Sequence, residues 1–297
     1  MKLAPIVLFV YNRPWHTEQT LNALELNILA DKSTLYIFCD GSKHEVSEEG
    51  LENIKKVRDF VKTKQWCEKV EIIERDTNLG LAANVIDGIT TVVNKHGSVI
   101  VLEDDLITSQ YFLTYCNEGL EMYESASNIY AINAFQFPLD INKTDTFLCP
   151  LSTSSWGWAT WKDKWNCFQE NIEFKDVIQN HDVLRRRFNI ADYDYASMLN
   201  NHKSWAIKWY YSVFLMNGLG LFPTKSLVEN IGFDGSGENC GIEEVYGKLS
   251  KSKVVLSKKE RINLEWYAML LDWFTDAKTE IAKKNTVVGK IKNFLKE

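Results

Sequence analysis

The chain has 297 residues, of which 45% are hydrophobic and 25% are charged. This is the composition of an ordinary globular protein, which excludes a disordered chain, and the length allows one large α/β domain or two smaller ones. The formal net charge of −6 argues against nucleic acid as a partner, because a surface that binds nucleic acid has to be basic. The charge is uneven, since residues 248–297 carry twelve Lys or Arg against six Asp or Glu.

Six cysteines are scattered along the chain and none forms a CxxC pair. This pattern predicts buried thiols in a reducing compartment rather than a zinc site of the usual spacing. The apolar run at residues 6–11 is too short to span a membrane, and no cleavage-site pattern follows it. We therefore expect a cytoplasmic protein.

The first 105 residues alternate between short apolar runs and amphipathic segments. The pattern predicts strands at 6–11, 35–39, 70–73 and 98–102, separated by helices at 17–29, 47–64 and 81–94. Such alternation is typical of a mostly parallel, Rossmann-like sheet with helices on both faces. Ligands of these sheets bind outside the carboxyl ends of the strands, so the polar residues that follow each strand are the candidate site.

After residue 106 the pattern becomes mixed. It predicts a helix at 110–124, a strand at 129–134, and short strands near 222–223 and 227–228 before a glycine-rich loop at 232–241. Residues 151–170 are dense in aromatic side chains, and Trp158, Trp161 and Trp165 have helical spacing. Residues 278–297 read as a basic amphipathic helix with six lysines, which either lies on an anionic bilayer or docks on the acidic body.

Three adjacent carboxylates, Glu103, Asp104 and Asp105, follow the fourth predicted strand. Clustered carboxylates repel one another, and a hard cation relieves that cost. Two of these carboxylates would not fill the octahedral coordination shell of such a cation, so ligand phosphates or waters would supply the remaining oxygens. The turn therefore predicts a magnesium or manganese site shared with a diphosphate. The alternative interpretation is a solvated loop in which Asp105 caps the following helix.

The other strand ends carry weaker signals that fall on the same edge of the sheet. Asp40 could accept hydrogen bonds from a base or ribose, or simply form a turn with Gly41. Arg13 could bind a base or phosphate, or form a surface ion pair. The segment from Asn78 through Gly80 to Asn84 opens a helix whose N–H groups could meet an anion or a sugar, or be capped by Asn78.

The ordered set of motifs resembles a known family. NRP after the first strand, CDGS after the second, NLGLAANV and then VLEDD resemble the nucleotide-sugar half of GT-A glycosyltransferases. EDD in place of the commoner DxD is similar to the N-acetylglucosaminyltransferase I family and to related bacterial polysaccharide and lipopolysaccharide glycosyltransferases. Trp158 followed by Trp165, and the segment PTKSLVENIGFDGSG at 223–237, match that pattern too, so the resemblance covers residues 4–245.

The resemblance implies a metal-dependent, inverting hexosyl- or N-acetylhexosaminyltransferase with a GT-A fold. It would move a sugar from a nucleoside diphosphate, UDP by default, to a saccharide or lipid-linked saccharide in surface polysaccharide synthesis. Residues 1–106 would bind the donor, 107–247 would bind the acceptor and cover the donor in the same domain, and 248–297 would form a basic tail. Asp105 would ligate Mn²⁺ or Mg²⁺. Glu103 and Asp104 would contact ribose and sugar, while Arg13 and Asp40 would hold the base.

One departure concerns the general base. The resemblance implies an acid between two tryptophans, but Trp205 and Trp209 enclose Ala-Ile-Lys. The candidates for the missing carboxylate are Asp234 first, because it lies in the glycine-rich loop, and then Glu238, Asp192 and Asp194. Asp234 has an equally good interpretation as a turn residue before Gly235.

Aromatic residues are the candidates for the acceptor site, because the apolar face of a sugar ring packs on an aromatic ring. Trp156 or Trp158 is expected in the acceptor cleft, and the remaining tryptophans in the core. Two rival functions stay open. One is a carbohydrate-binding or assembly protein on a transferase fold that has lost its base. The other is a sugar-nucleotide pyrophosphorylase, although VYNRPWHT lacks the glycine-rich basic loop expected there.

Overall fold

A computed structural model describes residues 2–150, 153–237 and 249–275. Its strands are β1 (Ile6–Val10), β2 (Thr34–Cys39), β3 (Lys69–Glu74), β4 (Ser98–Glu103), β5 (Leu106–Thr108), β6 (Ile129–Asn133), β7 (Thr146–Cys149), β8 (Trp158–Trp161), β9 (Leu219–Pro223) and β10 (Val228–Asn230). Its helices are α1 (Pro14–Glu25), the 3-10 turn η1 (Ala30–Lys32), α2 (Glu48–Val61), α3 (Leu81–His96), α4 (Phe112–Met122), α5 (Lys162–Trp165), α6 (Lys175–Asn180), α7 (Asp182–Phe188), α8 (Tyr195–Met198) and α9 (Trp205–Leu215).

Across these residues, one sheet of eight strands runs in the order β3-β2-β1-β4-β8-β6-β9-β7. The first four strands are parallel, as predicted. β8 then pairs antiparallel with both β4 and β6, β6 pairs parallel with β9, and β7 closes the sheet antiparallel to β9. The α/β class and the predicted division into a parallel half and a mixed half are thus confirmed. β5 and β10 form a separate antiparallel ribbon.

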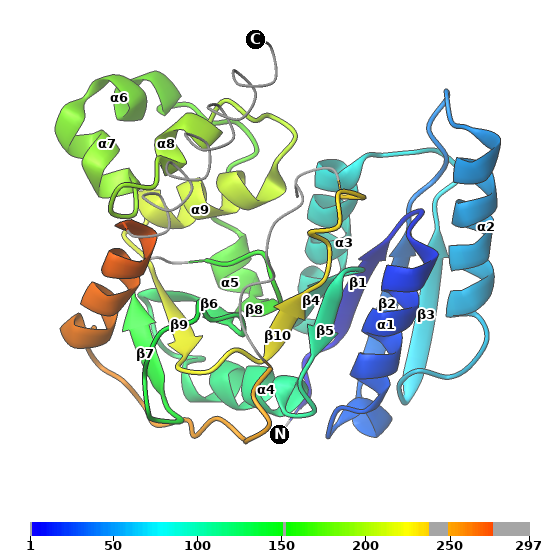
Figure 1. The fold of residues 1–297 in the computed structure, drawn as a ribbon, viewed down its shortest axis with the longest axis horizontal. Helices are drawn as coiled ribbons and strands as arrows, with labels where there is room; N and C mark the ends of the chain where they lie inside the picture. The colour runs from blue at the N-terminus through cyan, green and yellow to red at the C-terminus, as the bar shows by residue number, and fades with distance from the viewer. Residues whose placement is uncertain (1, 151–152, 238–248, 276–297) are drawn as a thin grey trace, which may run out of the picture.

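Helices cover both faces of the sheet (Figure 1). The apolar stripes of α1, α2 and α4 pack on one face, with Leu21, Val57 and Leu113 fully buried. α3 and α9 pack on the other face, around Val85 and Trp209. Strands β1, β2 and β4 are apolar on both sides because each face has its own helical layer, which is why they read as continuous apolar runs.

The predicted helix through Trp158, Trp161 and Trp165 is wrong. Residues 158–161 form strand β8, and only the short α5 follows. The strand alternates its side chains, so Trp158 enters the core beneath α3 and α9 whereas Ala159 and Trp161 enter the opposite core. A spacing of three residues fits a strand buried on both faces as well as a helix, and the sequence alone did not distinguish the two.

Residues 249–275, the first half of the predicted basic tail, pack on the body (Figure 1, orange). Ile262 forms a bridge with Leu148, and Lys259 pairs with Asp145 at 3.0 Å. Residues 264–275 are helical and bury Leu270 and Phe274 in a third apolar cluster. The predicted amphipathic helix at 278–297 lies outside the described residues. In the part of the chain that is described, no helix has the length and apolarity that crossing a membrane requires.

Candidate functional site

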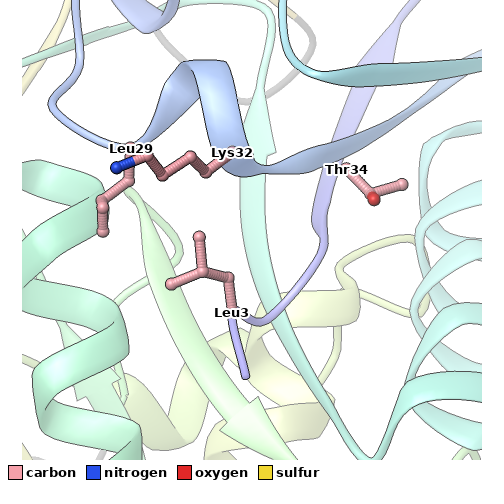
Figure 2. A pocket seen from close by; sticks show the side chains of 4 residues that line it. All are labelled: Leu3, Leu29, Lys32 and Thr34. Atoms are coloured by element: carbon pink, nitrogen blue, oxygen red, sulfur yellow. The ribbon is translucent and has the colours of Figure 1, made fainter. Parts of the chain in front are cut away.

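A cavity of about 880 Å³ lies at the carboxyl ends of β1, β2 and β4. It lies where the sheet topology predicts ligands to bind, and its volume is near the upper end of the roughly 300–1,000 Å³ typical of small-molecule sites. Its lining includes Arg13, Asp40 and Glu103 at the strand ends, together with residues of α9 and of the segment that carries Asp192 and Asp194. A second hollow near the amino ends of β1 and β2, lined by Leu3, Leu29, Lys32 and Thr34 (Figure 2), holds no carboxylate.

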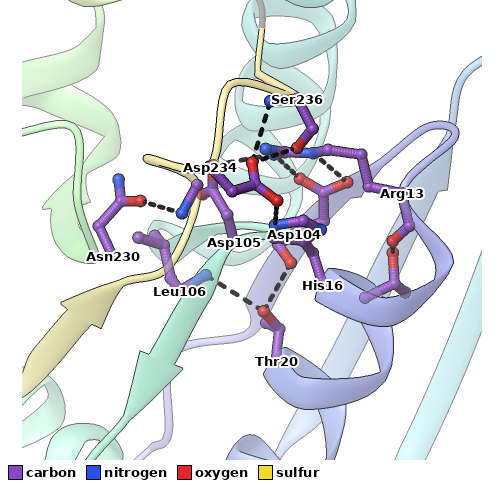
Figure 3. Close-up of polar contacts among 11 residues, drawn as sticks. Arg13, His16, Thr20, Asp104, Asp105, Leu106, Asn230, Asp234 and Ser236 are labelled. Carbon is purple, nitrogen blue, oxygen red and sulfur yellow. Dashed lines mark hydrogen bonds and ion pairs between the residues drawn. The ribbon is translucent and has the colours of Figure 1, made fainter. Parts of the chain in front are cut away.

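The centre of the cavity wall is an ion cluster between Arg13 and the acidic turn (Figure 3). The Nη2 group of Arg13 donates to Oδ2 of Asp105 at 2.8 Å and also to Asp104, while its Nε donates to Asp104 at 3.4 Å. Nη1 of the same guanidinium is buried and has no hydrogen-bond partner among the residues that the structure describes. An unpaired buried donor is costly, so Nη1 is suited to an anionic ligand in the cavity.

The backbone of the acidic turn is held by α1. The Oγ1 atom of Thr20 donates to the carbonyl of Asp104 at 2.7 Å and accepts from the N–H of Leu106 at 3.1 Å (Figure 3). Two successive peptide groups are thereby fixed by one hydroxyl, so the carboxylates on either side keep their orientation. No pattern in the sequence indicates this role, because a threonine in the second turn of a helix is ordinary.

Crowding and burial change the ionisation of the cluster. Burial, together with the charges of Asp105 and Asp104, raises the pKa of Glu103 to about 8, although Trp205 donates a hydrogen bond to its carboxylate. Burial also raises the pKa of Asp104, against the opposing effect of Arg13. For Arg13, burial acts to lower the pKa, but the two aspartates outweigh it and hold that pKa above its usual value.

Asp40 lines the cavity, but its carboxylate binds the protein itself. Oδ1 accepts from the N–H groups of Gly41 and Leu79, and Oδ2 accepts from Gly80 N–H and from the Asn78 side chain, all at 2.9–3.0 Å. Four donors occupy the acceptor sites of a carboxylate. In this structure Asp40 therefore joins the end of β2 to the turn before α3. Asn84, also on the cavity wall, accepts from Arg75 at 3.3 Å.

Gly41 is required at this junction. A Cβ atom there would lie 2.3 Å from the backbone carbonyl carbon of Thr77, which is far closer than atoms can approach. The glycine of the CDGS motif thus permits the backbone approach that lets Asp40 reach the turn.

The ribbon of β5 and β10 brings residues 228–237 against the acidic turn. The N–H of Ile231 donates to the carbonyl of Asp105 at 2.9 Å, and the N–H of Gly232 donates to the side chain of Asn230 at 2.7 Å. A Cβ atom on Gly232 would lie 2.3 Å from Oδ2 of Asp105, so a side chain there would displace the Asp105 carboxylate. The predicted donor-covering segment therefore lies next to the carboxylates.

Asp234, the first candidate for the base, does not line the cavity in this structure. Its side chain points to α1, where Oδ2 lies 3.2 Å from Nε2 of the buried His16, and Oδ1 accepts from the backbone and hydroxyl of Ser236 (Figure 3). The bonds from Ser236 lower the pKa of Asp234. It is not among the residues that line the cavity, so its turn interpretation fits better. Glu238 lies outside the described residues.

The two tryptophans proposed for the acceptor cleft lie in different places. Trp156 lines the cavity and packs on Phe135 and Phe233, with ring centroids 4.4 and 5.5 Å away. Trp158 has 0% exposure and stacks between Trp205 and Trp209. The acceptor role for Trp158 is therefore wrong, because the pleat of β8 directs this side chain into the core.

The residues of α9 that line the cavity bear on where the general base could be. Ala206 and Ile207 line the cavity between the two tryptophans, so the position where the resemblance implies an acid faces the cavity and carries none. Asp192 and Asp194 line the same wall. Asp194 pairs with Arg185 at 2.5 Å and accepts from Asn189 at 3.1 Å, and Arg185 lowers its pKa. Asp192 is exposed at this wall.

The donor atoms fit a cation shared with a diphosphate better than a metal held by protein alone. No group of three His, Cys, Asp or Glu side chains suited to a metal occurs among the residues described. Magnesium commonly takes only one or two carboxylates and completes its shell with phosphates and water. Asp105 would fit that role, although Arg13 contacts one of its carboxylate oxygens.

No family model matches the sequence, and no curated protein matches it either. Solved structures with a similar course of the chain include S. aureus TarS residues 1–349, with 10% identity, a TM-score of 0.42, and coverage of 76% of this chain and 60% of that one. Mouse xyloside xylosyltransferase 1 in its apo form has 9% identity, a TM-score of 0.35, and coverage of 72% and 81%. A UDP-glucose pyrophosphorylase complexed with UDP-glucose has 11% identity, a TM-score of 0.31, and coverage of 56% and 79%.

This chain thus spans less than two thirds of the TarS fragment that it matches. Because the sequence identities are near 10%, these likenesses do not indicate a function for this chain, and the function is argued from the site.

Proposed function

We propose that the protein is a glycosyltransferase that moves a sugar from a nucleoside diphosphate to a saccharide acceptor. The observation that carries this proposal is the buried, unpartnered Nη1 of Arg13 beside two carboxylates, at the ligand-binding edge of a parallel sheet. A diphosphate would satisfy this donor, and a base and ribose would extend toward Asn78 and Asn84 on the same wall.

Asp105 would hold Mn²⁺ or Mg²⁺ together with the diphosphate. Such an ion, when bound, neutralises charge that develops on a leaving diphosphate. Arg13 supplies a second positive charge that is already fixed in place by Asp104. Its Nη1 would donate to the diphosphate. This contact would orient the bond between sugar and phosphate toward the part of the cavity that Trp156 and Asp192 line. Glu103, with its raised pKa, is a hydrogen-bonding group for the sugar hydroxyls.

The base that takes the proton from the acceptor hydroxyl is Asp192 in this proposal. It lies on the wall that carries the aromatic side chains, and exposure keeps it accessible to a ligand. An inverting transfer needs a carboxylate near the acceptor hydroxyl and opposite the leaving group. UDP as the nucleotide, and hexosyl or N-acetylhexosaminyl transfer in polysaccharide synthesis, are the finer assignments that the motif resemblance supports.

The test is a panel of nucleotide-sugars with Mn²⁺, with Mg²⁺ and with chelator, scored by thermal shift and by release of nucleoside diphosphate. We expect one nucleotide-sugar to stabilise the protein in the presence of a divalent cation and to be turned over. Stabilisation by no nucleotide under any condition would refute the proposal.

The second candidate is a saccharide-binding protein on the same fold, which the lack of an acid at Ala206 and Ile207 favours. It predicts saccharide binding without turnover of any nucleotide-sugar, even when acceptor is supplied.

Residues 276–297 lie outside the described residues, and for them we propose contact with an anionic membrane surface. The six lysines at 278–297 support this, because a basic amphipathic helix binds anionic lipid and a lipid-linked acceptor would be found there. Co-sedimentation with anionic and neutral vesicles, comparing the full chain with one ending at residue 275, tests it. Equal binding by both would refute it.

A further inference from the structure

The segment that carries Asp192 is a tight turn between α7 and α8. The N–H of Tyr193 donates to the carbonyl of Ile190 at 2.8 Å, and the N–H of Ile190 donates to the carbonyl of Tyr193 at 3.3 Å. Ala191 and Asp192 are therefore the central residues of a β-turn. Ala191 has a φ of 47°, in the left-handed region that an alanine seldom adopts. A backbone in that region persists only where its surroundings hold it.

The turn is anchored at both ends by apolar packing. Before it, Phe188 and Ile190 are buried in the third apolar cluster, and after it Ala196 and Leu199 are buried in the same cluster. The short helices α6, α7 and α8 form one group around it (Figure 1). Packing thus fixes the two ends of the turn, whereas Asp192 in its middle lines the cavity.

Asp194 is the polar centre of this segment. Its Oδ2 accepts from Nη2 of Arg185 at 2.5 Å, and its Oδ1 accepts from Nδ2 of Asn189 at 3.1 Å. The side-chain oxygen of Asn189 accepts from the N–H of Ala196 at 2.9 Å, and Nη1 of Arg185 donates to the carbonyl of Gln179 at 3.1 Å. We call Arg185, Asn189 and Asp194 the clasp. It joins the residues before the turn to the residues after it.

The clasp also separates the roles of the two carboxylates in this segment. Both oxygens of Asp194 accept from protein donors, and the bond from Arg185, followed by that from Asn189, lowers the pKa of Asp194. A carboxylate bound in this way is a weak acceptor for the proton of a hydroxyl group. Asp192 lies two residues earlier, inside the turn that the clasp closes. The direction of its side chain therefore depends on the turn.

We infer that Arg185 and Asn189 are positioning residues for the general base. By holding Asp194 they fix the turn, and the turn sets the direction in which Asp192 meets the acceptor hydroxyl. Neither Arg185 nor Asn189 lines the cavity, so each acts through another residue. A base has to lie within hydrogen-bond reach of the proton that it takes, and a displacement of about 1 Å can cost about a hundredfold in rate. The inference rests on the proposed function, in which Asp192 is the base.

The test uses two variants of the clasp and one control on the full chain. Asn189→Ala removes both hydrogen bonds of the amide without adding a charge. Arg185→Met removes the guanidinium; the side chains of Arg185 and Asp194 are 41% and 39% exposed, so the loss of this pair should leave the protein folded. Arg186→Met is the control, because Arg186 is an exposed arginine on the same helix that does not line the cavity.

Each variant is made alone and together with Asp192→Asn, which gives a double-mutant cycle with the base. Turnover is the release of nucleoside diphosphate from the nucleotide-sugar panel with Mn²⁺, with water or p-nitrophenyl glycosides as the acceptor. Thermal shift with and without nucleoside diphosphate reports folding and the donor site on the same samples.

We expect Asn189→Ala and Arg185→Met each to lower kcat by about tenfold at unchanged nucleotide affinity, because the base is displaced and the donor site is not. Neither should lower kcat further when Asp192→Asn is present, because a residue that acts through the base has no effect once the base is lost. Arg186→Met should leave kcat unchanged. Arg185→Lys should lower kcat less than Arg185→Met, because a cation remains beside Asp194.

The inference is overturned if the clasp variants lower kcat equally with and without Asp192→Asn, since they would then act on the fold as a whole. It is also overturned if Asp192→Asn lowers kcat but the clasp variants match Arg186→Met; the proposed function would stand in that case. Normal kcat in Asp192→Asn alone would refute the assignment of the base and the inference with it. No release of nucleoside diphosphate by the unmodified chain would refute the proposed function itself.

Discussion

Removing the guanidinium of Arg13 should destabilise the folded protein far more than removing an exposed cation. Arg13→Met keeps the length of the side chain but leaves Asp104 and Asp105 facing each other without a counter-charge. The side chains of Arg13 and Asp104 are only 15% and 7% exposed. Breaking a buried pair in this way costs about 3 kcal/mol or more, because an uncompensated charge stays buried. For a chain of this size that is a fall in melting temperature of about 5 °C or more.

The measurement is chemical and thermal unfolding in chelator, within a double-mutant cycle. Lys56→Met is the control, because Lys56 and Glu52 form an ion pair that is more than half exposed and such exposed pairs contribute little to stability. Adding Asp104→Asn to Arg13→Met removes one of the unpaired charges and should recover about half of the loss. If Arg13→Met unfolds within about 1 kcal/mol of the unmodified chain, the ion cluster does not hold the acidic turn.

Three further predictions concern other parts of the site. Asp105→Ala should abolish Mn²⁺-dependent nucleotide binding in a thermal-shift titration while the protein stays folded; unchanged Mn²⁺ dependence would refute the metal assignment. Trp158→Ala should cost about 3–5 kcal/mol in unfolding free energy, because it empties a fully buried site; lost saccharide binding at unchanged stability would restore its acceptor role. Asp194→Asn should make stability fall less steeply as pH drops through the acid range, because a lowered carboxylate pKa contributes stability only above the usual value; an unchanged acid limb would show that Arg185 does not stabilise the fold through Asp194.

The parallel half of the fold could be predicted because its signals are local. Each of β1, β2 and β4 is an apolar run that ends in a polar turn, so the edge of the sheet and its residues followed from the chain order. Arg13, Asp104 and Asp105 meet there as that reasoning requires. The donor, the metal and the roles of these residues stay predictions.

The mixed half could not be predicted because its contacts join residues that are far apart in the sequence, and a local pattern does not indicate which of them meet. His16 meets Asp234 and Trp205 meets Glu103 across distant elements. Glu103, Asp234 and Trp205 each lie in a segment that the sequence marks, but no local pattern indicates that Trp205 meets Glu103 or that Asp234 meets His16. The orientation of the Trp158 side chain could not be predicted either. It is set by strand β8, where the spacing of the tryptophans had predicted a helix.

The identity of the base is where structure and resemblance disagree most. Asp192→Asn should lower turnover by at least about a hundredfold, because a general base acts in the transition state, and should leave donor affinity unchanged. Asp234→Asn is the matched control, since its carboxylate binds Ser236 and lies beside His16, away from the cavity. Turnover and nucleotide affinity are measured on both variants with one acceptor. A loss confined to Asp234→Asn would show that the segment at 233–237 rearranges when the donor binds, and Asp192 would not be the base. Near-normal turnover in both variants would exclude both Asp192 and Asp234 as the general base, and Glu238 would be the next carboxylate to substitute.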